Sequence, residues 1–255
     1  MIRILRYILL DLLRSRFTLF YTLLLFLSTV GLFQIDGDAN KVILSLLNIM
    51  LIVVPLVSIV FSTIHFHNSY EFIALMLSQP VARSRVFLAE FFAVALSLGL
   101  AFVVGIGLPM FIFGAIGSSP ILLFTGFILT IVFVALAFLA SVLTRDKARA
   151  IGIALLFWFY FSLLYDALVL WILYQFSDYP MDQATLVLVS LNPIDLARIL
   201  MMLQLDVSAL MGYTGAFFRH FFGSQLGMLF SLGGLIVWAI WPIVLANRIF
   251  NRKDL

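Results

Sequence analysis

Two features are scarce in this sequence: it contains no cysteine, and only 11% of its 255 residues are charged. Without a thiol the chain forms no disulfide and offers no thiolate, which excludes zinc ribbons, iron–sulfur clusters and cysteine-based copper relays. Soluble domains are about a quarter charged, so a hydrophobic content of 64% does not fit a soluble fold. The composition predicts a membrane protein, and the lack of cysteine favours a bacterial inner membrane.

Catalytic motifs are also absent. There is no Gly-x-x-x-x-Gly-Lys-Ser/Thr phosphate loop, so the chain cannot hydrolyse ATP by that route. Neither His-Glu-x-x-His nor Gly-x-Ser-x-Gly occurs. His65 and His67 lie two positions apart and face different sides of a helix, which favours interface histidines over metal ligands. We therefore expect no enzyme, and no metal or cofactor bound directly by this chain.

Six apolar runs are long enough to cross a bilayer, which takes about 20 residues. They predict an all-α polytopic membrane protein, folded as a single domain over residues 1–255. Gly105, Gly107 and Pro109 interrupt the third run, so we expect that crossing to kink or unwind near its outer end. The predicted crossings are Phe17–Ile35, Val42–Ile64, Val86–Phe113, Pro120–Leu143, Ala150–Gln175 and Gln225–Asn247.

The basic residues predict the orientation of the chain. If the N-terminus is cytosolic, all lysines and arginines except Lys41, Arg198 and Arg219 fall on the inner side of six crossings. This asymmetry is a strong positive-inside signal and predicts that both termini are cytosolic. The net charge of +3 then reflects orientation and contact with anionic membrane lipids, and it does not indicate nucleic acid.

Two segments outside the crossings are amphipathic. Residues 1–16 gather their charged side chains on one helix side, which predicts a helix lying in the inner membrane interface; packing on the bundle is the alternative. The periplasmic segment, residues 176–224, contains Asn192 and Pro193 followed by Asp195. Asn is a favoured N-cap and Pro a favoured first helical residue, so we expect short amphipathic helices on the outer surface.

Asp166 is the one acidic residue that we place deep inside a crossing. Burial of a charge there costs about 2.5–3.5 kcal/mol on insertion scales, so its side chain should face the bundle or water. A proton relay or a substrate contact would make the chain a secondary transporter. We favour a structural hydrogen bond to a neighbouring helix, or a position closer to the outer water.

A polar segment, residues 65–85, separates the second and third crossings and is predicted to be cytosolic. A short helix within it would place Leu75 and Met76 in a groove of a soluble motor, with Glu71 paired to a basic residue of that motor. Because two crossings leave the segment directly, a push on this coupling helix would tilt both. The alternative is an ordinary loop with snorkelling arginines.

This segment also resembles a known family. Residues 70–88, YEFIALMLSQPVARSRVFL, resemble the first cytosolic loop of type-2 ABC transporter permeases. The six crossings, the N-terminal interfacial helix and the outer helices before the last crossing are similar to that family. The outer stretch 191–218, LNPIDLARILMMLQLDVSALMGYTGAFF, is similar to a narrower group, the NosY-type permeases of the system that matures the copper centres of nitrous oxide reductase. The resemblance covers essentially the whole chain.

The resemblance implies a second copy of this subunit and a separate cytosolic subunit that binds ATP with Mg and docks on the loop. It also implies a periplasmic β-helical copper-handling protein on the outer helices. A generic type-2 exporter of lipid or drug is the alternative. The expected ATPase contacts are Tyr70, Glu71, Phe72, Leu75, Met76, Gln79, Pro80, Arg83 and Arg85. The expected periplasmic contacts are Asn192, Asp195, Arg198, Met202 and Asp206.

Overall fold

The computed structural model describes residues 2–36, 38–115, 120–176, 182–204 and 213–252, and the regular secondary structure within these ranges is helical. A π-helical turn, Tyr160–Leu164, joins α7 to α8. The helices are α1 (Ile2–Leu13), α2 (Arg16–Ile35), α3 (Ala39–Asn68), α4 (Tyr70–Leu77), α5 (Arg83–Ile112), α6 (Pro120–Leu143), α7 (Lys147–Phe159), α8 (Tyr165–Gln175), α9 (Asp182–Ser190), α10 (Pro193–Gln204) and α11 (Tyr213–Arg252).

The six predicted crossings are confirmed as helices long and apolar enough to span a membrane. Each begins or ends within a few residues of the predicted run. The fifth is compound, because α7, the π turn and α8 form one span, Lys147–Gln175. The sixth is the second part of α11, Gln225–Arg252.

Polar caps begin three of these spans. Ser15 accepts a hydrogen bond from the backbone N–H of Thr18 at the start of α2, 3.2 Å away. Asp38 caps α3 in the same way through the N–H of Asn40, at 3.0 Å. A capping side chain satisfies a helix N–H group that has no partner inside the helix. Short polar breaks therefore separate the long apolar helices at defined residues.

The third crossing does not unwind at the residues that interrupt its apolar run. The α-helix continues past Gly105, Gly107 and Pro109 to Ile112. A Cβ atom at Gly105 would lie 2.8 Å from Cβ of Leu25 and 3.0 Å from the backbone carbonyl oxygen of Thr22. The glycine thus allows close approach of α2, as small residues do at helix interfaces in membranes.

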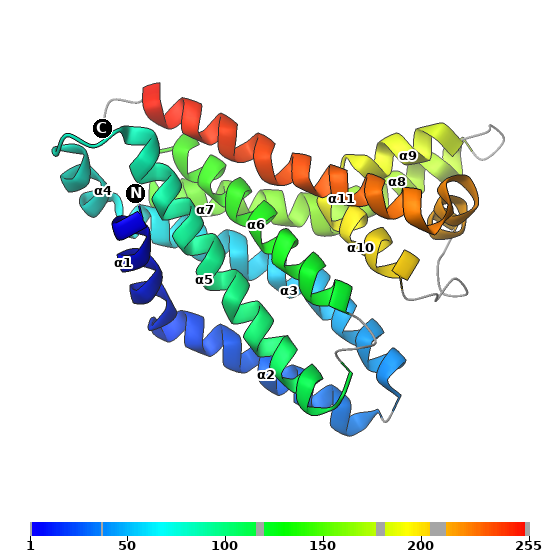
Figure 1. The fold of residues 1–255 in the computed structure, drawn as a ribbon. Helices are drawn as coiled ribbons and strands as arrows, with labels where there is room; N and C mark the ends of the chain where they lie inside the picture. The colour runs from blue at the N-terminus through cyan, green and yellow to red at the C-terminus, as the bar shows by residue number, and fades with distance from the viewer. Residues whose placement is uncertain (1, 37, 116–119, 177–181, 205–212, 253–255) are drawn as a thin grey trace.

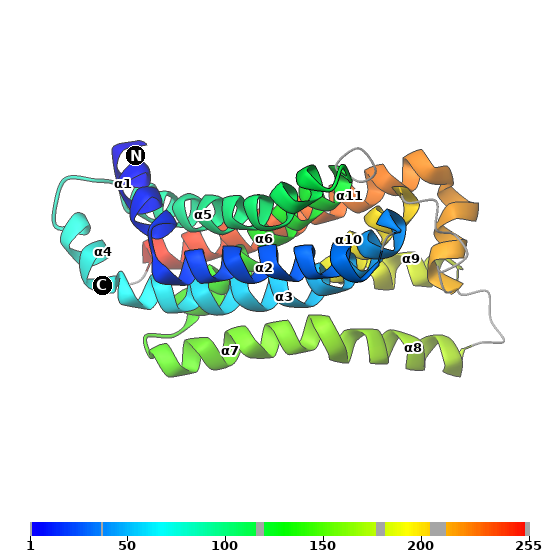
Figure 2. The same ribbon diagram turned by 90° about the horizontal axis from the view of Figure 1, so that it is seen from below.

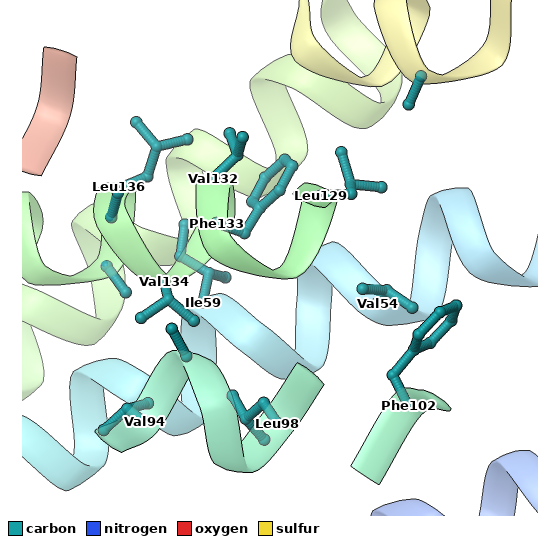
Figure 3. Packing of buried hydrophobic residues seen from close by; sticks show 14 of the residues in the cluster. Val54, Ile59, Val94, Leu98, Phe102, Leu129, Val132, Phe133, Val134 and Leu136 are labelled. Atoms are coloured by element: carbon teal, nitrogen blue, oxygen red, sulfur yellow. The ribbon is translucent and has the colours of Figure 1, made fainter. Parts of the chain in front are cut away.

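Three helices form the centre of the bundle. The most apolar windows of α3, α5 and α6 are 56%, 67% and 67% buried, against 22% for α2, 22% for α7–α8 and 17% for α11. Figure 3 shows side chains of the three central helices in contact, including Ile59, Leu98 and Phe133. The outer three helices keep apolar faces exposed, as expected of surfaces that face lipid or another membrane protein.

The short helices lie at opposite ends of the bundle. Helices α1 and α4 lie near both chain termini at one end, while α9 and α10 lie at the other (Figures 1 and 2). We refer to these as the α4 end and the α10 end. Helix α1 packs along α5 and buries Ile8 and Leu12, while Tyr7 and Leu10 stay exposed. Its amphipathic pattern therefore has an inner face on the bundle and a free outer face.

Candidate functional site

Helix α4 is anchored to the bundle by one side and exposed on the other. Ile73 is buried, and Phe72 and Met76 pack against the apolar core from partly buried positions. On the opposite side Glu71 is exposed and Leu75 is 64% exposed. A large apolar side chain beside a carboxylate on a free helix face is a surface suited to a protein partner.

The predicted pairing of Leu75 with Met76 on one contact face was wrong. Adjacent helical residues point about 100° apart, and the structure turns Met76 toward the core while Leu75 faces outward. The exposed face instead combines Leu75 with residues one turn away. Its members are Tyr70, Glu71, Ala74, Leu75 and Ser78, and we call this set the α4 outer face.

The connection from α4 to α5 is also exposed. Gln79, Pro80, Arg83 and Arg85 all lie at the surface of the α4 end. Val86 is buried immediately afterwards, so the change from polar connection to packed span takes place within one turn. The structure therefore places these four predicted contact residues on the same end as the α4 outer face.

A cluster of aromatic rings joins the spans at the α4 end. The Phe66 ring lies edge-on to those of Phe87, Phe138 and Phe250, with centroid distances of 6.1, 5.2 and 6.3 Å. Edge-to-face geometry at these distances is favourable for aromatic pairs. The four rings come from α3, α5, α6 and α11, so they join four spans at the α4 end.

A buried acid that the sequence analysis missed lies close by. Glu90 is 1% exposed inside α5, so the prediction that Asp166 is the one acid deep in a crossing was wrong. Its Oε2 lies 3.1 Å from Nε2 of His65 on α3, and Ser69 lies 3.3 Å from the same nitrogen. The pair joins the two spans that flank α4. A glutamate at the start of an apolar run, with a histidine ending the preceding run, was the available signal.

Helix α1 also reaches α4. The rings of Tyr7 and Phe72 are stacked, with centroids 6.4 Å apart and planes inclined by 25°. Because α1 packs on α5 as well, the interfacial helix and α4 share one support. The predicted N-terminal helix is thus a neighbour of α4.

A cleft of about 400 Å³ opens beside α4. Lys147 stands at its edge, where Nζ donates a 2.8 Å hydrogen bond to Asn68. Asp146 begins α7 there, and the backbone N–H of Arg149 donates to its carboxylate and lowers the pKa of that carboxyl. An apolar floor and a polar rim suit a protruding side chain of a partner. The lining residues are Phe66, His67, Tyr70, Glu71, Ser141, Val142, Thr144, Arg145, Lys147 and Phe250.

At the α10 end, the predicted helix start is confirmed. Asn192 precedes Pro193, the first residue of α10, and its Oδ1 accepts a 2.9 Å hydrogen bond from the backbone N–H of Ile194. Its Nδ2 donates to the carbonyl of Phe161, 3.1 Å away in the π turn, and to Asp195 at the same distance. Asn192 therefore caps α10 and also bonds it to the fifth span.

Asp166 takes part in this arrangement. Its Oδ2 accepts a 3.1 Å hydrogen bond from Arg198, which also donates to Asp195 at 2.9 Å. The expected hydrogen bond from Asp166 to a neighbouring helix is present, and its role as a structural bond stays a prediction. We call Asp166, Asn192, Asp195 and Arg198 the α10 polar cluster.

The predicted periplasmic contacts are placed unequally. Asn192 is 0% and Asp195 8% exposed, so both side chains are directed into the chain, and their prediction as surface contacts needs correction. Arg198 is about a third exposed, and Met202 packs on the core from a partly buried position. Asp206 lies outside the described residues. Within the described part of the chain, no three His or carboxylate side chains gather as metal ligands.

Comparison with known proteins agrees with this architecture. Residues 4–255 match the model of a family described as ABC-2 family transporter protein. A protein of Pseudomonas aeruginosa named "Probable ABC transporter permease protein NosY" is 27% identical over 268 residues, covering 96% of this chain and 95% of that protein. A protein of the same name from Stutzerimonas stutzeri is 28% identical over 277 residues, covering 95% of each.

Proposed function

The chain belongs to the ABC-2 family as a membrane permease subunit, and we propose that it couples ATP hydrolysis by a separate cytosolic subunit to a periplasmic partner. The process served is maturation of the copper sites of nitrous oxide reductase. In this proposal ATP and Mg are bound by the partner subunit, and the permease works as a pair of identical chains in a bacterial inner membrane. Both termini are cytosolic.

The α4 outer face is the observation that carries the coupling part of the proposal. It presents Leu75 and Glu71 to the exterior, while Ile73 on the opposite side is buried. The aromatic cluster and the His65–Glu90 pair join α4's flanking spans to the rest of the bundle. A partner that pushes on this face would therefore move whole spans.

Basic residues support the cytosolic assignment of the α4 end. Arg83, Arg85 and Lys147 lie there, together with Arg248 and Arg252 at the end of α11. Positive charge gathers on the cytosolic side of membrane proteins. On this assignment the α10 end faces the periplasm, where the proposed β-helical partner would meet Arg198 and its neighbours.

The copper-maturation part is supported by relatives rather than by a metal site. Two proteins named as NosY permeases match this chain over nearly its full length. A mechanical role requires no line of metal ligands through the bundle. The chain would transmit movement to the partner that handles copper.

The first test is to isolate the tagged chain from its native membrane in mild detergent and identify bound proteins by mass spectrometry. Recovery of an ATP-binding subunit together with a periplasmic repeat protein supports the whole proposal. Recovery of an ATP-binding subunit alone favours a generic exporter of lipid or drug. Absence of any ATPase contradicts the coupling role.

A matched pair of leucines tests the coupling face directly. Leu75 and Leu170 are 64% and 68% exposed, the first on α4 and the second on α8 near the other end. Leu75→Ala should weaken binding of the ATP-binding subunit about tenfold. Loss of a central apolar contact costs about 1.4 kcal/mol of binding free energy, which corresponds to a tenfold change in Kd. Leu170→Ala should leave that binding unchanged, and equal binding by both variants would contradict the assignment of α4.

A further inference from the structure

The fifth span is held differently along its two halves. Its inner half, α7, packs on α3 and α6, and its residues Ile153, Ala154 and Phe157 belong to the apolar core or pack against it. The outer half, α8, buries Tyr165 and Val169, neither of which belongs to that core. Both halves lie along the edge of the bundle (Figure 2). Apolar packing therefore fixes α7 well and α8 poorly.

The π turn, Tyr160–Leu164, lies where these two halves meet. A π turn widens the helix and disturbs its regular hydrogen bonding, and such turns are recognised points of helix bending. In a bilayer a loosened backbone carbonyl needs a partner, which neighbouring helices often supply. Here Nδ2 of Asn192 donates a hydrogen bond to the carbonyl of Phe161, at 3.1 Å. Asn192 lies between α9 and α10, and we call these two helices with their connection the outer hairpin.

Polar bonds also attach the first turn of α8 to that hairpin. Tyr165 donates a hydrogen bond to the carbonyl of Leu188 at the end of α9. Asp166 accepts one from Arg198, which is held in turn by Asp195. Lipid chains provide no hydrophobic force that brings helices together. Hydrogen bonds between helices therefore make a large contribution to the position of an exposed helix such as α8.

We propose that the π turn is a hinge of the fifth span, and that Asn192 and Arg198 of the outer hairpin hold α8 in line with α7. Release of these bonds lets α8 swing about Tyr160–Leu164 while α7 stays in the bundle. The outer hairpin and the fifth span are then mechanically linked at one point. The hinge stands on the geometry alone, and its use in the ATP-driven cycle rests on the proposed function.

The lack of cysteine makes a direct measurement possible. Spin labels on cysteines introduced at Leu156 of α7 and Leu170 of α8, which are 66% and 68% exposed, report the distance across the π turn. The full chain in lipid nanodiscs should give one narrow distribution, near the roughly 21 Å that a continuous helix covers in this interval. Asn192→Ala and Arg198→Met should each add a shorter, broader population.

Two further variants separate the hinge from general loosening. Asn192→Ser can still cap α10 but cannot reach the Phe161 carbonyl, so it should behave like Asn192→Ala. Trp158→Phe removes a comparable bond of the same span, the 3.3 Å donation from Trp158 to the carbonyl of Ile52, and should keep the parental distribution. If Arg198→Met does not insert into the membrane, Arg198→Lys replaces it as the test variant, because lysine cannot bridge two carboxylates with the fork geometry of arginine.

The outcomes decide the inference without reference to transport. Unchanged distances in the Asn192 and Arg198 variants would overturn the hinge, as would an equal change in Trp158→Phe. A parental result for Asn192→Ser alone would assign the effect to the α10 cap and overturn the role of the Phe161 carbonyl. If the ATP-binding subunit does not bind but these distances change as expected, the hinge stands and the proposed coupling fails.

Discussion

The α4 end and the α10 end position their short helices by different forces. At the α4 end, aromatic rings from four spans pack edge to face, and α4 packs against the apolar core through buried and partly buried side chains. At the α10 end, a carboxamide, a guanidinium and two carboxylates join the hairpin to the fifth span. Dense apolar packing makes a rigid support, whereas a few directional bonds can break and form again. The two ends therefore differ in the forces that hold them, and on the proposed function the α4 end receives force while the α10 end changes shape.

The largest expected effect comes from the aromatic cluster. Phe66 is 4% exposed and contacts three other rings, so Phe66→Ala should lower the free energy of unfolding by about 3 kcal/mol through the cavity it leaves. Thermal unfolding in detergent, followed by tryptophan fluorescence, measures the loss. Phe111 on α5 is 70% exposed, and Phe111→Ala should change stability little. If both variants lost similar free energy of unfolding, the packed Phe66 ring would contribute no more to stability than the exposed Phe111 ring.

The polar end should respond less strongly to one substitution. Asn192→Ala removes the cap of α10 and the bond to the Phe161 carbonyl, and should cost about 2 kcal/mol. The same unfolding assay measures this, and amide hydrogen exchange should rise locally in the π turn. A uniform rise in exchange over α3 and α6 would show that the α10 polar cluster supports the whole bundle and is not a local bond.

Two adjacent glycines test how closely α10 approaches α11. A Cβ at Gly234 would lie 2.7 Å from Cδ1 of Leu196, while one at Gly233 would meet nothing within 4 Å. Leu196 is fully buried and has little room to move, so Gly234→Ala should cost about 1 kcal/mol. Gly233→Ala should be neutral or slightly stabilising, because alanine favours helix. Equal midpoints of unfolding for the two variants would contradict close packing at this contact.

The smallest effect on stability is expected at the α4 outer face. Leu75→Ala removes an exposed side chain and should change the free energy of unfolding by less than about 0.5 kcal/mol. Its proposed effect is on binding of the ATP-binding subunit. A clear loss of stability in this variant would mean that Leu75 is packed, and the α4 end would then offer no free apolar contact.

Local sequence pattern was sufficient for the elements themselves. Apolar runs of bilayer length predicted the six spans, because each must satisfy its own backbone hydrogen bonds within the membrane. Asn192, Pro193 and Asp195 predicted where α10 begins, since a cap acts on the residues directly after it. The glycines and the proline of α5 misled for the opposite reason. Gly105 serves the close approach of α2, which the local pattern does not contain.

The sequence by itself therefore determined the six spans and the polar segments between them. Tertiary structure alone decided which side of α4 is free, that Glu90 meets His65, and that Arg198 joins Asp166 to Asp195. The physical reason is distance along the chain. Helix formation and capping act over a few neighbouring residues, whereas these contacts join residues on separate helices, and only packing of the whole bundle brings them together.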